Sequence, residues 1–123
     1  MPVNPSDFIE FAKNLACPDE ISRRTSISRA YYGCYHFSEI LCAQKGIDLS
    51  TGSSSGGIHK RLCAAMQGSQ DANMRSLGDK LDRLRKKRIR ADYDLADQVG
   101  AKETAKIVCK CERLLVELKK NSP

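Results

Sequence analysis

The longest uninterrupted helical pattern in the chain is residues 19–45, DEISRRTSISRAYYGCYHFSEILCAQK. Its apolar residues recur every three or four positions, the spacing that places them on one face of an α-helix. Acidic residues open the pattern and Gly46 follows it as a stop signal. At about 1.5 Å per residue the helix is roughly 40 Å long, enough to span a small domain. Its inner face is predicted to be Ile27, Ala30, Tyr31, Cys34, Ser38, Leu41 and Cys42.

A glycine, Gly33, lies in the middle of this helical pattern. Glycine inside a helix costs about 1 kcal/mol relative to alanine. A close crossing of a second helix, which leaves no room for a Cβ atom, would explain the residue, but the sequence does not identify the partner.

Four shorter helical patterns accompany the long one. The first runs from about Pro5 or Ser6 to Ala16, with Asn4 or Ser6 as its N-cap. The others are expected at about 58–66, 72–91 and 101–120, and a Gly- and Ser-rich stretch at 49–57 predicts a polar loop. No strand pattern competes. We therefore expect an all-α, up-and-down bundle of about five helices with a long second helix, forming a single domain over residues 1–123. The apolar sets of the first and last helices are Phe8, Ile9, Phe11, Ala12 and Leu15, and Thr104, Ile107, Val108, Cys111, Leu114, Leu115 and Leu118.

Composition agrees with a small globular domain. Hydrophobic residues make up 41% of the 123 residues and charged residues 29%. The polar start of the chain has no apolar run typical of a signal peptide, and no stretch approaches the ~18 apolar residues of a membrane span. We therefore expect a cytoplasmic protein without a membrane partner, whose six cysteines are reduced thiols packing as small hydrophobes. Their spacing is not that of a zinc site, so neither a metal nor a cofactor is expected.

The formal net charge of +6 is concentrated in residues 80–90, which contain seven basic residues and one acid. A basic segment of this kind favours phosphate-rich partners by long-range attraction. The simpler interpretation is a solvated helix face in a mildly basic protein.

The apolar stripe of the fourth helix continues onto an arginine. Stepping by three and four, it comprises Met74, Leu77, Leu81, Leu84, Arg88 and Ala91. Arginine is almost never fully buried without a partner, because a desolvated charge is costly unless it is paired. Three explanations remain open at this point. Arg88 extends to water where the helix ends, it pairs internally with an acid, or it faces a ligand in a cleft or subunit interface. The candidate acids are Asp92, Glu39 and Asp94.

Tyrosines and histidines cluster on the long helix. Tyr31, Tyr32 and Tyr35 lie beside His36, whereas His59 follows the Gly- and Ser-rich stretch. Aromatic residues at helical spacing are usually core, and a core or capping role is the default for both histidines. No serine-histidine-aspartate order and no phosphate-binding glycine loop is recognisable.

Two segments of the chain resemble signatures of the prokaryotic HEPN domain family. Residues 24–32, RTSISRAYY, followed by Tyr35 and His36, are similar to the family pattern R-T-A-x-S-R-A-Y-Y-A-x-F-H. Residues 84–95, LRKKRIRADYDL, are similar to the pattern L-x-x-x-R-x-x-A-D-Y-D of one subgroup, and His59 fits its third helix. The two segments lie about sixty residues apart, on the helices where the family has them. The resemblance covers almost the whole chain.

The resemblance implies a helical domain that commonly forms a homodimer, with the motif segments of two protomers facing one cleft. Many members of the family are metal-independent ribonucleases in toxin–antitoxin, CRISPR and other antiviral defence systems. Their catalytic motif is an arginine followed, after four to six residues, by a histidine. Arg88 matches the arginine, whereas Tyr93 stands at the histidine position. Because the pKa of tyrosine is near 10, Tyr93 is a poor general base at neutral pH.

The first functional hypothesis is a toxin-type or defence protein that binds or cleaves RNA. Arg88 would contact the scissile phosphate with Tyr93 as its catalytic neighbour. The residues expected to bind the nucleic-acid backbone are Arg85, Lys86, Lys87 and Arg90, and those expected to support the site are Arg29, Tyr32, His36 and Asp92.

The second hypothesis is a non-catalytic dimeric module that binds a nucleotide or partners another protein, such as a nucleotidyltransferase or an antitoxin. Some relatives pair with nucleotidyltransferases that modify a tyrosine near this motif. Tyr93 would then be a modification or nucleotide-contact site. A homodimer is expected under both hypotheses.

Overall fold

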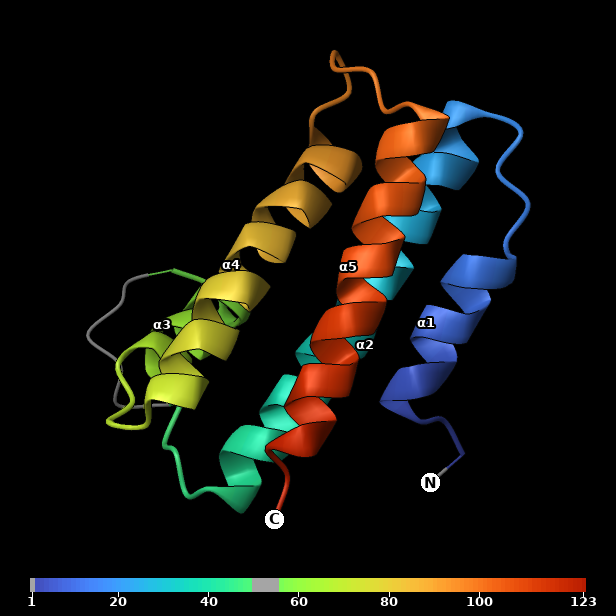
Figure 1. The fold of residues 1–123 in the computed structure, drawn as a ribbon. Coiled ribbons are helices and arrows are strands. Elements are labelled where there is room, and N and C mark those ends of the chain that lie inside the picture. The colour runs from blue at the N-terminus through green and yellow to red at the C-terminus, as the bar shows by residue number, and fades with distance from the viewer. Residues whose placement is uncertain (1, 50–55) are drawn as a thin grey trace.

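The structure is a computed structural model that describes residues 2–49 and 56–123. Within these ranges it is an all-α bundle without strands, which confirms the predicted fold class. Figure 1 shows α1 and α4 running in one direction and α2 and α5 in the other. Most of the polar loop predicted at 49–57 lies outside the described residues. The helices are α1 (Pro5–Asn14), α2 (Glu20–Gln44), α3 (Ile58–Gln67), α4 (Ala72–Tyr93) and α5 (Ala101–Lys120).

Each observed boundary lies within two residues of its prediction, because the sequence carries local start and stop signals. Asn4, rather than Ser6, precedes α1, and its N–H donates to the Asp7 carboxylate at 2.8 Å. The Asp19 carboxylate accepts from the N–H of Ser22 at 2.9 Å and caps α2. These side chains satisfy backbone N–H groups that have no partner within their helix.

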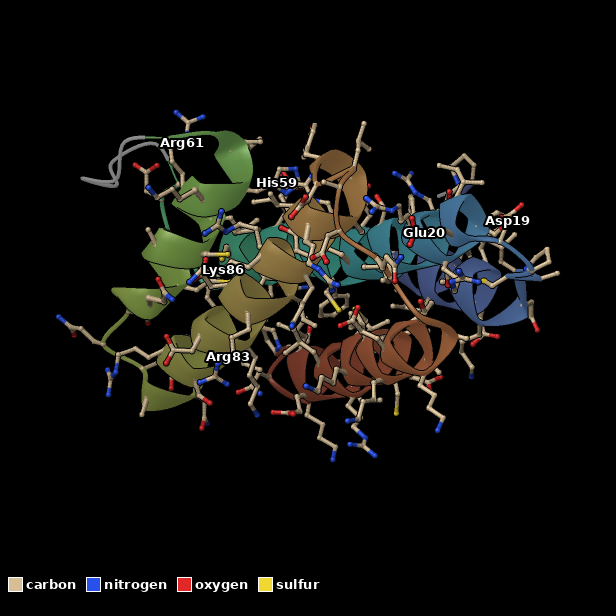
Figure 2. All side chains as sticks on the ribbon, turned by 90° about the horizontal axis from the view of Figure 1, so that it is seen from above. Asp19, Glu20, His59, Arg61, Arg83 and Lys86 are labelled. Atoms are coloured by element: carbon tan, nitrogen blue, oxygen red, sulfur yellow. The ribbon has the colours of Figure 1, made fainter. Side chains whose placement is uncertain are left out.

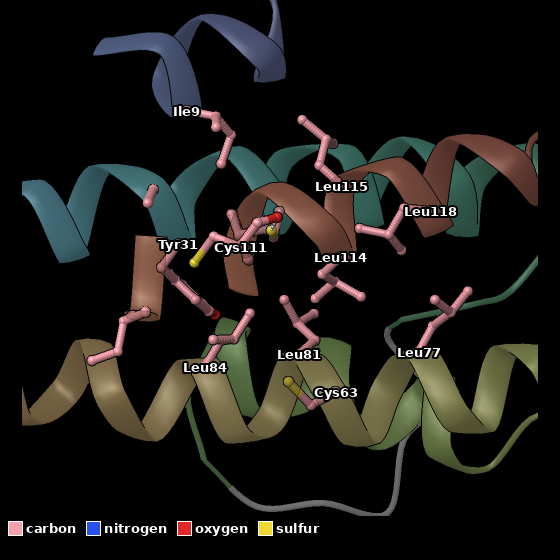
Figure 3. Packing of buried hydrophobic residues seen from close by; sticks show 14 of the residues in the cluster. Ile9, Tyr31, Cys63, Leu77, Leu81, Leu84, Cys111, Leu114, Leu115 and Leu118 are labelled. Carbon is pink, nitrogen blue, oxygen red and sulfur yellow. Dashed lines mark hydrogen bonds between the residues drawn. The ribbon is translucent and has the colours of Figure 1, made fainter. Parts of the chain in front are cut away.

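The inner faces predicted for α2 and α5 are buried in full. The long α2 packs against α1, α4 and α5, while α3 packs mainly on α4. Figure 3 shows the leucines of α4 turned toward Leu114 and Leu118 of α5. One apolar assignment was wrong: Phe11 is 53% exposed. It lies about 200° around the helix from the buried Ile9, so the two residues cannot share a face of this short helix.

All six cysteines are free thiols, and four of them are buried. The packing role predicted for all six is confirmed for these four, whereas Cys17 and Cys109 are only half-buried. No helix in the described part of the chain is long and apolar enough to cross a membrane.

The partner helix of Gly33 is α1. A Cβ atom at Gly33 would lie 2.8 Å from the carbonyl oxygen of Pro5 and 2.9 Å from Cγ1 of Ile9. The predicted close crossing is confirmed, because both distances are shorter than real Cβ contacts allow.

We expect Gly33→Ala to lower the free energy of unfolding by about 1–3 kcal/mol, since the added methyl must push α1 away from α2. The matched control is Gly68→Ala at the end of α3, where φ is −87° and the nearest atom, the carbonyl oxygen of Ala64, would be 3.4 Å away. Its effect should stay within about 0.5 kcal/mol. Urea unfolding followed by circular dichroism measures both, and equal stabilities would contradict the close crossing.

Candidate functional site

The face of α2 that carries the first motif packs on the end of α4 that carries the second. The hydroxyl of Ser28 donates to Oδ2 of Asp92 at 3.2 Å, and Nη1 of Arg24 donates to the carbonyl oxygen of Ala91 at 3.0 Å. Arg24 and Ser28 are four residues apart, so they share a face of α2. Two segments far apart in the sequence thus form one structural unit.

Arg24 holds the end of α4 and the connection that follows it. The side chain is 5% exposed. In addition to its bond to Ala91, Nη1 donates to the carbonyl oxygen of Arg90 at 3.3 Å. Nη2 donates to the carbonyl oxygens of Asp94 and Asp97 at 2.8 and 2.6 Å. Carbonyls in the last turn of a helix have no partner within it, and Arg24 supplies that partner. Sequence reasoning missed this role, because no local pattern indicates which distant backbone an arginine contacts.

Arg88 points into the bundle and is 7% exposed, so the explanation that it extends to water is wrong. Nη1 lies 3.4 Å from Oδ2 of Asp92, which confirms an internal pair, although at the long limit of a hydrogen bond. The guanidinium carbon lies 5.4 Å from the ring centroid of Tyr31. Nε is buried and has no hydrogen-bond partner within the described residues. The charge of Arg88 is therefore only partly compensated.

A second guanidinium, that of Arg29, contacts one of the tyrosines that Arg88 contacts. The guanidinium carbon of Arg29 is 4.7 Å from the ring centroid of Tyr32, and that of Arg88 is 5.7 Å from the same centroid. Cation–π attraction to this ring stabilises each of the two guanidinium groups. Tyr32, Arg29 and Asp92 are half-buried, so they form the rim through which solvent approaches Arg88.

His59 of α3 lies against the same tyrosines. Its Nδ1 is 3.0 Å from the Tyr31 hydroxyl, and its ring centroid is 4.1 Å from that of Tyr35. Figure 2 shows His59 between α3 and the end of α4. Burial, and then the positive charge of Arg88, lower the pKa of His59. We refer to Arg29, Tyr31, Tyr32, His59, Arg88 and Asp92 as the Arg88 cluster.

His36, expected to support the site, sits at the edge of this cluster. Its ring centroid lies 5.8 Å from that of Tyr32, and its Nδ1 lies 3.6 Å from Oε1 of Glu39. The hydroxyl of Tyr35 donates to the other carboxylate oxygen of Glu39 at 3.0 Å. Glu39, a candidate partner of Arg88 from the sequence, is thus engaged by Tyr35 and His36.

We expect the pKa of His59 to lie below its ordinary value of 6.5, and Arg88→Met to raise it. Since the folded state disfavours protonation of His59, the stability associated with this group is present above pH 6.5 and is lost as the pH falls through the folded-state pKa. NMR titration of the imidazole Cε1 protons measures both values, with His59→Asn to assign the resonance. A wild-type pKa at or above the ordinary value would contradict the burial of this ring against Arg88.

Tyr93, the predicted catalytic neighbour of Arg88, lies at the exposed end of α4. Its side chain is 71% exposed, whereas Arg88 is buried. Five residues correspond to roughly 140° around an α-helix, so the two side chains leave α4 on different sides. The structure does not bring Tyr93 into the Arg88 cluster.

The predicted backbone-binding residues on α4 differ in their availability. Lys87 is exposed, and the Lys86 side chain is 68% exposed with its ammonium 3.4 Å from Asp82. Arg85 is only 14% exposed and pairs with the same carboxylate at 2.8 Å. Figure 2 shows Lys86 and Arg83 on α4, in the half of the molecule away from Asp19 and Glu20.

Arg90, the fourth of these residues, is engaged within the chain. It pairs with Asp97, and its Nη1 lies 2.5 Å from Oε1 of Glu103. Its Nη2 donates to the carbonyl oxygen of Gln98 at 2.7 Å. An RNA phosphate would have to displace these acids, so a backbone-binding role for Arg90 stays a prediction.

The chain matches no protein-family model, no curated protein and no solved structure. Among residues 2–49 and 56–123, no three His, Cys, Asp or Glu side chains are arranged so that they could hold a metal ion.

Proposed function

We propose that this chain is a HEPN-like domain of the toxin or defence type that binds RNA at the Arg88 cluster and cleaves it without a metal. One observation carries the proposal. The guanidinium groups of Arg29 and Arg88 lie 4.7 and 5.7 Å from the centroid of one tyrosine ring, that of Tyr32. The acid beside them, Asp92, contacts Arg88 only at 3.4 Å. A phosphate would supply the missing negative charge.

A phosphodiester fits the unpaired groups of the cluster. The buried Nε of Arg88 needs an acceptor, and a non-bridging phosphate oxygen forms a strong, charge-assisted hydrogen bond with a guanidinium. Arg29 offers further donors from the half-buried rim. The ring of Tyr32 offers an aromatic face for an unstacked base, as is usual in single-stranded RNA recognition.

His59 is the residue we assign to the role of the histidine that the second motif lacks. Its lowered pKa keeps the imidazole neutral at pH 7, which a general base requires. In the tautomer whose Nδ1–H donates to the Tyr31 hydroxyl 3.0 Å away, Nε2, for which the described residues offer no hydrogen-bond partner, accepts the proton of the RNA 2′-hydroxyl. The 2′-oxygen then bonds to phosphorus, the bond to the 5′-oxygen breaks, and that oxygen takes up a proton from water. Arg88 stabilises the charge that develops on phosphorus-bound oxygens.

The binding test is fluorescence anisotropy of a fluorescein-labelled single-stranded RNA in EDTA. Arg29→Gln and Arg88→Met should each weaken binding about tenfold or more, because each removes a charged hydrogen-bond donor. The matched control is Arg61→Gln on the exposed face of α3, which should bind nearly as tightly as wild type. Equal losses in all three variants would show a general charge effect and contradict a phosphate site at the cluster.

Cleavage of an end-labelled RNA in EDTA tests the catalytic part. Wild type should cleave, Arg88→Ala should not, and His59→Asn should bind without cleaving. Equal residual cleavage by all three proteins would identify a contaminant. Binding without cleavage by folded wild type would overturn the ribonuclease assignment and leave the RNA-binding one.

The exposure of Tyr93 favours a second candidate, a non-catalytic dimeric module that partners a nucleotidyltransferase. A side chain that is 71% exposed is accessible to a modifying enzyme. Intact-mass analysis after incubation with ATP and a nucleotidyltransferase from the same genome would then show nucleotide addition to wild type and none to Tyr93→Phe. Light scattering at micromolar concentration tests the homodimer expected for both candidates, and a monomer would contradict a shared cleft.

A further inference from the structure

A groove of about 650 Å³ runs between α4 and α5, along the face of α4 that adjoins α5. Its floor consists of apolar side chains, Leu84 of α4 and Ile107 and Leu114 of α5, all of which belong to the bundle core. Its walls are the aliphatic stems and charged ends of basic residues from both helices. No residue of the Arg88 cluster lines it, so it is a separate feature of the molecule.

Ion pairs between the two helices close both ends of this groove. Lys80 pairs with Glu117 at 2.7 Å at one end, and Arg90 pairs with Glu103 at 2.5 Å at the other. The ten residue steps from Lys80 to Arg90 correspond to about 15 Å of helix. The opening is therefore as long as three turns of an α-helix.

Between the two ion pairs the walls carry positive charge that the chain does not neutralise. On the α4 side the groove is lined by Arg83 and Lys87, and on the α5 side by Lys110 and Arg113. All four side chains are exposed, and none forms an ion pair within the described part of the chain. Two cations from each helix, about one helical turn apart on their own helix, thus flank the apolar floor.

We propose that the α4–α5 groove binds an acidic amphipathic helix of a protein partner. Such a helix would place an apolar stripe on Leu84, Ile107 and Leu114, and carboxylates on both flanks opposite the four cations. Cations on α4 and α5 recur at three- and four-residue steps, which is the spacing of carboxylates along the flank of a facing helix. The partner would relieve the repulsion across the groove and cover its floor.

The chemistry of the groove distinguishes this occupant from others. A compact anion needs one cluster of donors, whereas these cations are spread along about 15 Å of helix. An RNA strand uses aromatic faces or hydrogen-bonding groups for its bases, and none lines this apolar floor. An acidic amphipathic helix matches both parts of the groove, because its aliphatic side chains cover the apolar floor and its carboxylates pair with the cations of the walls.

The test uses a fluorescein-labelled synthetic 18-residue peptide with leucines at helical spacing and glutamates on both flanks. We expect saturable binding below about 100 µM, with shifts of the methyl resonances of Leu84, Ile107 and Leu114. Arg83→Glu combined with Arg113→Glu should weaken binding at least about tenfold. The matched control is Arg61→Glu combined with Arg75→Glu on exposed faces of α3 and α4, which should leave binding within about twofold.

Three results would overturn the proposal. One is no saturable binding up to millimolar peptide, and another is equal binding of a scrambled peptide of the same composition. The third is a single-stranded RNA that shifts the groove methyls at lower concentration than the peptide, which would assign the groove to nucleic acid. Because the RNA tests above use Arg29, His59 and Arg88, none of which lines the groove, failure of either proposal is distinguishable from failure of the other.

Discussion

Arg24→Ala is expected to lower the free energy of unfolding by about 3–5 kcal/mol, because several backbone carbonyls lose a charged donor and each buried polar group left unsatisfied costs about 1–3 kcal/mol. In a domain of this size that loss corresponds to a fall in the melting temperature of roughly 10–20 °C. The reason is the number of groups that Arg24 satisfies. Its guanidinium donates to four backbone carbonyls at the end of α4 and in the following connection, and its Nε lies 3.6 Å from Glu20.

Two further variants test whether the loss of stability comes from the hydrogen bonds of Arg24. Arg24→Lys keeps the charge but loses the planar fork of donors, so it should recover only part of the stability. Arg61→Ala removes an exposed arginine and should change the free energy of unfolding by no more than about 0.5 kcal/mol. Guanidinium unfolding followed by circular dichroism measures all three. An Arg24→Ala protein as stable as Arg61→Ala would show that the carbonyl contacts contribute nothing.

Arg88→Met is expected to have the opposite pattern, a large loss of RNA binding with little loss of stability. Methionine continues the apolar stripe of α4 at a position that is 7% exposed, and it removes a buried Nε that has no partner in the described structure. Asp92 keeps its hydrogen bond from Ser28 and is 26% exposed, so water can solvate its charge. Replacing a poorly paired buried charge by an apolar residue is often neutral or stabilising by about 1–4 kcal/mol.

The measurement for Arg88→Met combines urea unfolding with RNA anisotropy on the same preparation. The control is Arg88→Ala, which should be less stable than Arg88→Met by about 2 kcal/mol, because alanine leaves a cavity. A loss of more than about 2 kcal/mol in Arg88→Met itself would contradict the idea that Arg88 is retained for a ligand. Arg88 would then be a structural clamp between α2 and α4.

The fold could be predicted from the sequence because the signals that determine its helices are local. Apolar spacing, caps and breakers placed every helix boundary within two residues, and the inner faces of α2 and α5 were assigned without error. The position of Gly33 indicated a close crossing, yet only the structure identifies α1 as the partner. Phe11 was assigned wrongly, since ten residues of α1 contain too few turns for the apolar spacing to define a face.

The candidate site could be predicted less completely from the sequence, because it depends on contacts between distant segments. The stripe of α4 identified Arg88 as anomalous from spacing alone, with Asp92 as one of three candidate acids, and only the structure shows that Asp92 is the one it pairs with. The position of His59 beside Tyr31 and Tyr35 could not be derived, since it depends on how α3 docks. The engagement of Arg90 by Asp97 and Glu103 was missed for the same reason. Basic residues counted along a sequence do not reveal which of them are neutralised in the fold.

The contact between the two motif segments has a consequence for how substitutions combine. Ser28 and Asp92 are 64 residues apart but share a hydrogen bond, and Tyr32 shares a cation–π contact with Arg88. Substitutions within such pairs are not additive, so a double-mutant cycle across α2 and α4 should show a coupling energy of about 0.5–3 kcal/mol. Among diverging relatives, the members of each pair are then expected to covary. A distant relative is better identified by a matched pair at these positions than by either segment alone.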